Sequence, residues 1–130
     1  MQQNLPSGIY PPLPTFFDAQ DELDLATLQR HILRIADSGI AGYVLMGTNG
    51  EAVHLSNDER AQVIATAREV LESSGYSSMP LIAGCGDFST RATLDHCRQA
   101  ARSRAMPLPT NGAASRDCSC PRRQAVVKVR

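Results

Sequence analysis

The stretch that decides the fold runs from residue 39 to residue 51 and reads GIAGYVLMGTNGE. Its centre, residues 41–46, is a short continuous apolar run bounded by glycines, which is typical of a strand buried on both faces of a parallel sheet. A glycine-rich loop, residues 47–51, follows directly. Because parallel α/β proteins form their active sites where strands end and loops lead into helices, this loop is the first candidate site.

Amphipathic helices are predicted on both sides of this strand. Asp24 is a suitable N-cap for a helix whose apolar residues fall three or four apart and which ends at Gly39. Ser56 opens the S-x-x-E pattern of a capping box, and the apolar stripe that follows it continues to about Ser73. The strand therefore lies between two well-marked helices.

Two further strands are predicted around this unit. Residues 8–17 are mostly apolar but contain three prolines, so they predict only a short, edge-like first strand. Residues 80–83 predict a third strand, followed by a tight turn and by a third helix that Asp87 or Ser89 could cap. The resulting order βαβαβα favours parallel strands joined by right-handed crossovers.

The composition permits one ordinary globular domain, since the chain has 130 residues of which 42% are hydrophobic. The formal charge of zero conceals two unlike parts. Residues 1–101 carry twelve acidic side chains against six basic ones, whereas residues 102–130 carry seven basic side chains against one acidic one. The second part is rich in proline, arginine and serine and shows no capped helix or alternating strand, so we predict an irregular basic tail over residues 102–130.

The sequence predicts a cytoplasmic protein. No apolar run approaches the roughly 18 residues needed to cross a bilayer, and residues 1–8 show neither the basic flank nor the apolar core of a secretory signal. In a reducing compartment the four cysteines are expected as free thiols. They are Cys85, Cys97, Cys118 and Cys120.

A zinc site is a weaker alternative. His96 and Cys97, together with Cys118 and Cys120, could supply four ligands, but the usual closely spaced cysteine pairs are absent. Adjacent residues on a helix also point about 100° apart. We therefore expect no metal and no other cofactor.

Nucleic-acid binding by the tail is also a weaker alternative. Arg116, Arg122 and Arg123 could contact phosphates, but no aromatic residue follows Phe88 to stack on bases. We expect neither a nucleic acid nor a membrane as a partner.

The loop at residues 47–51 has the composition of an anion-binding turn. Gly47 and Gly50 permit a tight turn and close backbone approach, and Thr48 offers a hydroxyl. The backbone N–H groups of Thr48 and Asn49 could face a carboxylate. Glycine-rich turns after strands are common, however, and the pentapeptide by itself favours an ordinary connecting loop.

The wider sequence resembles the dihydrodipicolinate synthase and N-acetylneuraminate lyase family over residues 8–101. The resemblance is carried by residues 39–51, by LSNDER at 55–60 and by PLIAGCG at 80–86, in the family's order and spacing. It implies a pyruvate-dependent class I aldolase on a TIM (β/α)8 barrel, with a 2-oxo acid as its small-molecule partner. Residues 1–101 would supply the first three βα units of that barrel.

The same resemblance implies roles for two residues. Thr48 corresponds to a hydroxyl that relays a proton to a catalytic tyrosine, and the amides of Thr48 and Asn49 correspond to binders of the substrate carboxylate. Asn49 stands where a threonine is usual in dihydrodipicolinate synthases, which looks more like the 4-hydroxy-2-oxoglutarate aldolase branch.

The catalytic lysine and tyrosine of the family have no counterpart here. Such an aldolase needs a lysine amine to form a Schiff base with the ketoacid. The only lysine is Lys128, which has no strand context, and Tyr10, Tyr43 and Tyr76 all precede the position expected for the tyrosine. We therefore expect a truncated, inactive chain whose tail comes from a shifted reading frame or a splice product. The alternative is a non-catalytic interaction module that associates through exposed sheet edges or as a homo-oligomer.

Overall fold

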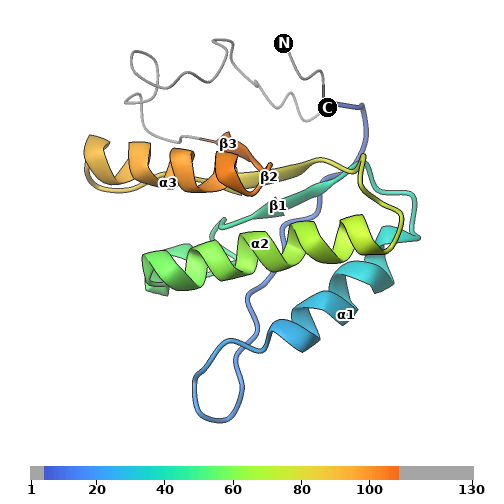
Figure 1. Cartoon of the computed structure of the whole chain (residues 1–130), viewed down its shortest axis with the longest axis horizontal. Coiled ribbons are helices and arrows are strands. Elements are labelled where there is room, and N and C mark those ends of the chain that lie inside the picture. Colours follow the sequence, from blue (N-terminus) through green and yellow to red (C-terminus); the bar gives the residue numbers. More distant parts are fainter. Residues whose placement is uncertain (1–4, 109–130) are drawn as a thin grey trace.

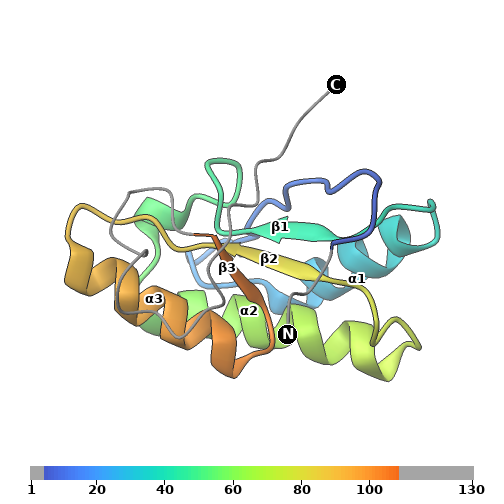
Figure 2. The same ribbon diagram turned by 90° about the horizontal axis from the view of Figure 1, so that it is seen from above.

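A computed structural model describes residues 5–108 and shows a parallel sheet covered by helices. The strands are β1 (Tyr43–Leu45), β2 (Leu81–Gly84) and β3 (Met106–Leu108), in the spatial order β1-β2-β3 with both pairs parallel. The helices are α1 (Leu25–Ala36), α2 (Asn57–Ser73) and α3 (Thr90–Arg102), with a short 3-10 helix, η1 (Ala52–His54). In both views α2 lies between α1 and α3 (Figure 1, Figure 2). The predicted α/β class and the parallel βα alternation are confirmed.

The proline-rich segment near the start lies along the free edge of β1. The amide of Leu13 donates to the carbonyl of Val44 at 2.9 Å, and the amide of Val44 donates to the carbonyl of Pro11 at 3.1 Å. Only one isolated parallel bridge, between Pro12 and Val44, results. Prolines lack the N–H that a longer ladder needs. The segment lies at an edge, as predicted, but the predicted first strand is reduced to this single bridge.

The prediction that the regular pattern ends at residue 101 is wrong by one strand. Met106–Leu108 pairs with β2, and the carbonyl of Leu108 accepts a hydrogen bond of 3.0 Å from the amide of Cys85. Successive residues of a strand direct their backbone polar groups to opposite sides, so Pro107 needs no N–H toward β2. The rest of the predicted irregular tail, residues 109–130, lies outside the described residues.

The core fills the space between the sheet and the helices. Leu28 and Ile32 of α1 lie four residues apart on one face, and both are at most 1% exposed. Tyr43 of β1 is fully buried, and its hydroxyl donates a 2.6 Å hydrogen bond to the carbonyl of Ile32. Burial raises the pKa of Tyr43 to about 12. The tyrosine thus joins the sheet to α1 while its one polar atom stays paired.

The helix boundaries follow from local capping. Asp24 caps α1 by accepting from the amide of Thr27, although the helix ends at Ala36, before the predicted Gly39. Ser89, and not Asp87, caps α3. At α2 the predicted capping box is present: Ser56 Oγ accepts from the amide of Glu59, whose carboxylate accepts from the amide of Ser56.

Replacing Ser56 by alanine is expected to lower the free energy of unfolding by about 1 kcal/mol, because the first turn of α2 loses its cap. Urea unfolding followed by circular dichroism measures the change. Ser74→Ala at the other end of α2 is the control, since this exposed side chain makes no hydrogen bond to the described residues. Equal effects of the two substitutions would contradict the assignment of the cap.

Candidate functional site

The predicted loop leaves β1 at the carboxyl end of the sheet and makes two successive turns. The amide of Gly50 donates to the carbonyl of Gly47, and that of Glu51 donates to the carbonyl of Thr48, each at 3.1 Å. Met46 and Glu51 flank the turns with φ values of 56° and 53°. The left-handed backbone at both ends bends the loop back toward the start of α2.

Thr48 and Asn49 form the exposed tip of this loop. Within residues 5–108 no backbone hydrogen bond uses their amides, and no side chain there pairs with the Thr48 hydroxyl. Two adjacent N–H groups and one hydroxyl are therefore left for solvent or a ligand. Successive amides in a tight turn are a common way for proteins to hold an anion. The structure thus brings both predicted site residues together at the strand end.

A buried threonine from the proline-rich segment bonds to the backbone of the loop. Thr15 is 8% exposed, and its hydroxyl donates a 2.7 Å hydrogen bond to the carbonyl of Gly50. A Cβ atom at Gly50 would lie 3.2 Å from the carbonyl oxygen of Leu13 and from the amide of Met46. A side chain at this position would therefore be tightly packed against the edge of the sheet, and a neighbouring backbone atom would have to shift by a few tenths of an ångström to admit it.

The end of β2 presses against the same loop. A Cβ atom at Gly84 would stand 2.2 Å from the carbonyl oxygen of Met46, well inside any permitted contact. The absence of a side chain at Gly84 therefore sets the spacing between the turns that follow β1 and β2.

Polar residues that the sequence analysis did not connect with this loop lie behind the two turns. His96 of α3 is 6% exposed, and its Nε2 lies 3.0 Å from Oδ1 of Asn57. Its Nδ1 lies 3.8 Å from the carboxylate of Asp87. Burial, and next the nearby charge of Arg60, lower the pKa of His96, and burial lowers the pKa of Arg60 as well.

The signal for Arg60 is present in the sequence. Arg60 stands three, four and seven residues before Val63, Ile64 and Ala67, so it shares their buried stripe on α2. A charged residue on an apolar stripe needs buried hydrogen-bond partners, so its position predicts polar contacts inside the fold. Thr15 gives no such signal, because its partner Gly50 is 35 residues away.

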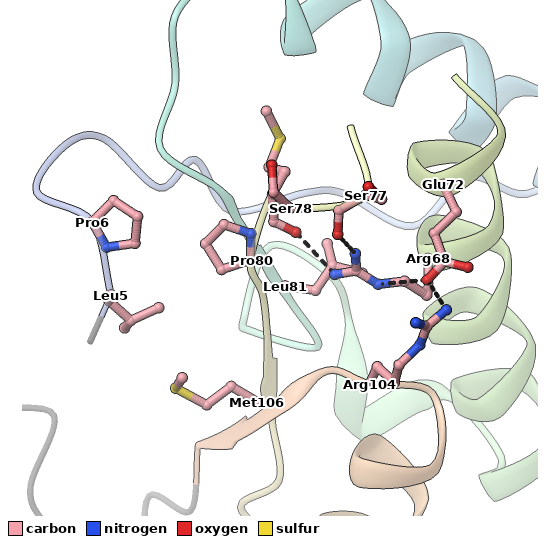
Figure 3. Close-up of a pocket in the computed structure, with 11 residues that line it drawn as sticks. Leu5, Pro6, Arg68, Glu72, Ser77, Ser78, Pro80, Leu81, Arg104 and Met106 are labelled. Carbon is pink, nitrogen blue, oxygen red and sulfur yellow. Dashed lines mark hydrogen bonds and ion pairs between the residues drawn. The ribbon is translucent and has the colours of Figure 1, made fainter. Parts of the chain in front are cut away.

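A pocket of about 390 Å³ lies at the opposite end of the strands, away from Thr48 and Asn49. Its cationic groups are engaged: Arg68 donates to the carbonyls of Ser77 and Met79 at 3.2 and 3.0 Å, and Arg104 pairs with Glu72 (Figure 3). We assign this end of the sheet a structural role.

The zinc and phosphate-binding alternatives involve residues of which the structure describes only some. His96 and Cys97 lie side by side on α3, and residues 5–108 contain no cluster of three or more side chains suited to a metal ion. Cys118 and Cys120, which the zinc alternative also needs, lie outside the described residues, as do the three arginines of the phosphate alternative and Lys128.

In the described part of the chain, no helix has the length and apolar character to span a membrane.

A parallel sheet built from consecutive βα units, with a glycine-rich turn at the carboxyl end of a strand, is the arrangement expected of one segment of a (β/α)8 barrel. The chain belongs to the dihydrodipicolinate synthetase family, whose model matches residues 5–106. That match reaches into β3, in agreement with the additional strand.

Two fungal proteins illustrate the relationship. An L-threo-3-deoxy-hexylosonate aldolase of Hypocrea jecorina is 43% identical over 99 residues, which cover 75% of this chain and 31% of the relative. A protein of Emericella nidulans, named as a mitochondrial 4-hydroxy-2-oxoglutarate aldolase, is 45% identical over 94 residues, or 72% of this chain and 30% of the relative. The chain thus spans about a third of the length of these relatives.

Solved structures agree with the fold. A dihydrodipicolinate synthase family protein of Coccidioides immitis superimposes with a TM-score of 0.71 at 42% identity, covering 78% of this chain and 33% of that protein. Escherichia coli YagE, solved in complex with pyruvate, gives a TM-score of 0.71 at 26% identity with the same coverage.

Replacing Gly84 by alanine is expected to cost about 1–3 kcal/mol, because the new methyl group would overlap the carbonyl of Met46. Gly47→Ala is the matched control in the same pair of turns, since a Cβ atom there meets nothing within 4 Å. Urea unfolding of both variants measures the difference. A Gly84→Ala chain as stable as Gly47→Ala would show that the two turns are not in contact.

Stability is expected to fall between pH 7.5 and pH 5.5. The pKa of His96 in the folded chain lies below its ordinary value of about 6.5, so on acidification the unfolded chain takes up a proton that the folded chain resists. The loss of stability is small at pH 7.5, sets in as the pH approaches the ordinary pKa of about 6.5, and grows as the pH falls toward the folded pKa. Urea midpoints at the two pH values measure it, and His96→Gln should flatten the dependence.

His54→Gln is the control for this pH dependence, because His54 is exposed on η1. The control should keep the dependence of the wild-type chain. A dependence that persists in His96→Gln and disappears in His54→Gln would contradict the role given to the buried imidazole.

Proposed function

We propose that this chain is the N-terminal part of an aldolase or lyase acting on pyruvate or a related 2-oxo acid, and that its loop at residues 47–51 binds the substrate carboxylate. The observation that carries the proposal is the pair of adjacent amides at Thr48 and Asn49, exposed at the carboxyl end of β1 and unused by the described backbone. A carboxylate accepting both N–H groups would satisfy them with charge-assisted hydrogen bonds.

The relatives support this class of substrate. Both fungal proteins have names that say aldolase, and YagE was solved with pyruvate. In the complete enzyme, we propose that the Thr48 hydroxyl passes a proton to a tyrosine contributed by another part of the barrel, while the two amides fix the ketoacid. Neither Thr48 nor Asn49 is the nucleophile in this scheme.

The bond-making step needs an amine that this part of the fold does not supply. A Schiff base requires a lysine near the bound carbonyl, and residues 5–108 contain none. We therefore propose that the chain binds a 2-oxo acid without turning it over. The attribution of residues 102–130 to a shifted frame or a splice product also stays our proposal, although residues 106–108 of that range form a regular strand. The cytoplasmic location likewise stays a prediction.

A non-catalytic role is the second candidate, because β3 is an outer strand of the sheet that residues 5–108 form. In that case it would associate with another copy or with a full-length relative, through the sheet. Measuring its oligomeric state by light scattering separates this candidate from simple ligand binding.

The carboxylate proposal predicts which amides respond to a ligand. In a 15N-labelled sample titrated with pyruvate, the amide resonances of Thr48 and Asn49 should shift, because their N–H groups gain a charged acceptor. Methyl pyruvate is the matched control, since it keeps the ketone and lacks the carboxylate. Shifts that are equal for the two ligands, or confined to residues distant from the loop, would contradict the proposal.

The absence of turnover predicts a negative trapping result. Borohydride added with pyruvate should leave the mass of the chain unchanged, because reduction fixes only a ligand bound as an imine. A mass increase of one reduced pyruvate would show that the chain forms the Schiff base after all. A full-length relative treated in parallel controls for the reaction conditions.

A further inference from the structure

Two buried arginines of α2 bond to backbone carbonyls at opposite ends of the sheet. Arg60 and Arg68 lie eight residues apart on the buried stripe of α2 and are 3% and 7% exposed. Each donates two hydrogen bonds to backbone carbonyls outside α2. Arg68 donates to carbonyls in the segment before β2, at the amino ends of the strands. Arg60 donates to the carbonyl of Ala52, which begins η1, and to that of Gly84, the last residue of β2, both near the carboxyl ends of the strands.

The two hydrogen bonds of Arg60 lie near the two ends of the candidate loop. Its Nη1 donates to the carbonyl of Ala52 at 3.2 Å, and its Nη2 donates to the carbonyl of Gly84 at 2.8 Å. Ala52 is the first residue after the loop, at the start of η1. Gly84 lies in contact with the carbonyl of Met46, the last residue before the loop.

We propose that Arg60 is the positioning residue for the carboxylate-binding amides of Thr48 and Asn49. It fixes the carbonyl of Ala52, directly after the loop, and the carbonyl of Gly84, whose backbone packs against the carbonyl of Met46 directly before the loop. Movement of Ala52 away from the end of β2 would therefore break a charge-assisted hydrogen bond. The identity of the ligand rests on the proposed function. The fixing of the loop does not, because it follows from the contacts of the unliganded chain.

The geometry requires a guanidinium and not merely a positive charge. Arginine presents several N–H donors in one rigid plane, which lets a single side chain reach two carbonyls from different turns. Lysine offers a single nitrogen on a flexible stem and cannot reproduce both contacts at once. Arg60→Lys therefore keeps the charge and loses the bridge.

Three variants of the 130-residue chain test the proposal: Arg60→Met, Arg60→Lys and Arg68→Met. The third is the matched control, since it removes an equally buried arginine and an equal number of carbonyl contacts from the same helix. Two quantities are measured by NMR, the 15N order parameters of residues 47–51 without ligand and the dissociation constant for pyruvate.

Arg60→Met should lower the order parameters of the loop from about 0.85, typical of a rigid backbone, to below about 0.6. The order parameters within α2 of the same variant should stay unchanged. Affinity for pyruvate should fall about tenfold, because the ligand must then order a loop that Arg60 no longer fixes. A tenfold change is the size of effect expected for the loss of one hydrogen bond to a charged group. Arg60→Lys should show the same changes to a smaller degree, and Arg68→Met should show neither.

Each other outcome has a defined meaning. If the loop stays ordered in Arg60→Met, or if Arg68→Met loosens it as much, Arg60 does not position the loop. If Arg60→Met fails to fold, Arg60→Lys decides, and a loop as ordered as in the wild-type chain overturns the proposal. If the wild-type chain does not bind pyruvate, the proposed function fails, while the order parameters still decide the role of Arg60.

Discussion

The arrangement at the carboxyl end of the sheet depends on how closely two backbones approach, those of Gly84 and Met46. A Cβ atom at Gly84 would overlap the carbonyl oxygen of Met46. Because that space is empty, the turn after β1 lies directly against the end of β2, and one guanidinium from α2 spans both. The amides of Thr48 and Asn49 lie exposed above this packing, where Thr15 holds the carbonyl of Gly50 within the loop and Arg60 holds the carbonyl of Ala52 directly after it.

The parts of the fold that depend on neighbouring residues could be predicted from the sequence. The spacing of Ser56 and Glu59 predicts the capping box that begins α2, and the apolar run at 41–46 predicts the strand observed at Tyr43–Leu45. β3 could not be predicted in this way. Its three residues include Pro107, and whether a proline is tolerated depends on which side of the strand meets β2, which only the pairing register settles.

The site was predictable in outline only. The glycines and the family resemblance pointed to Thr48 and Asn49, and the structure places both at the end of β1. The residues that support them come from distant positions: Thr15 belongs to the proline-rich segment and Arg60 to the following helix. Hydrogen bonds between residues far apart in sequence leave no periodic pattern, and only the charge of Arg60 on an apolar stripe gave a sign of its partners.

The contacts that shape the loop within the described chain all come from residues 13–84, one continuous stretch that precedes α3. A gene segment encoding that stretch would carry the complete turn geometry with it into any larger barrel. The remaining βα units of such a barrel could then diverge, by duplication or exchange, without rebuilding this corner. The loop could be inherited as a unit in this way because its contacts close within one continuous stretch of the chain, although the residues that make them are far apart in it.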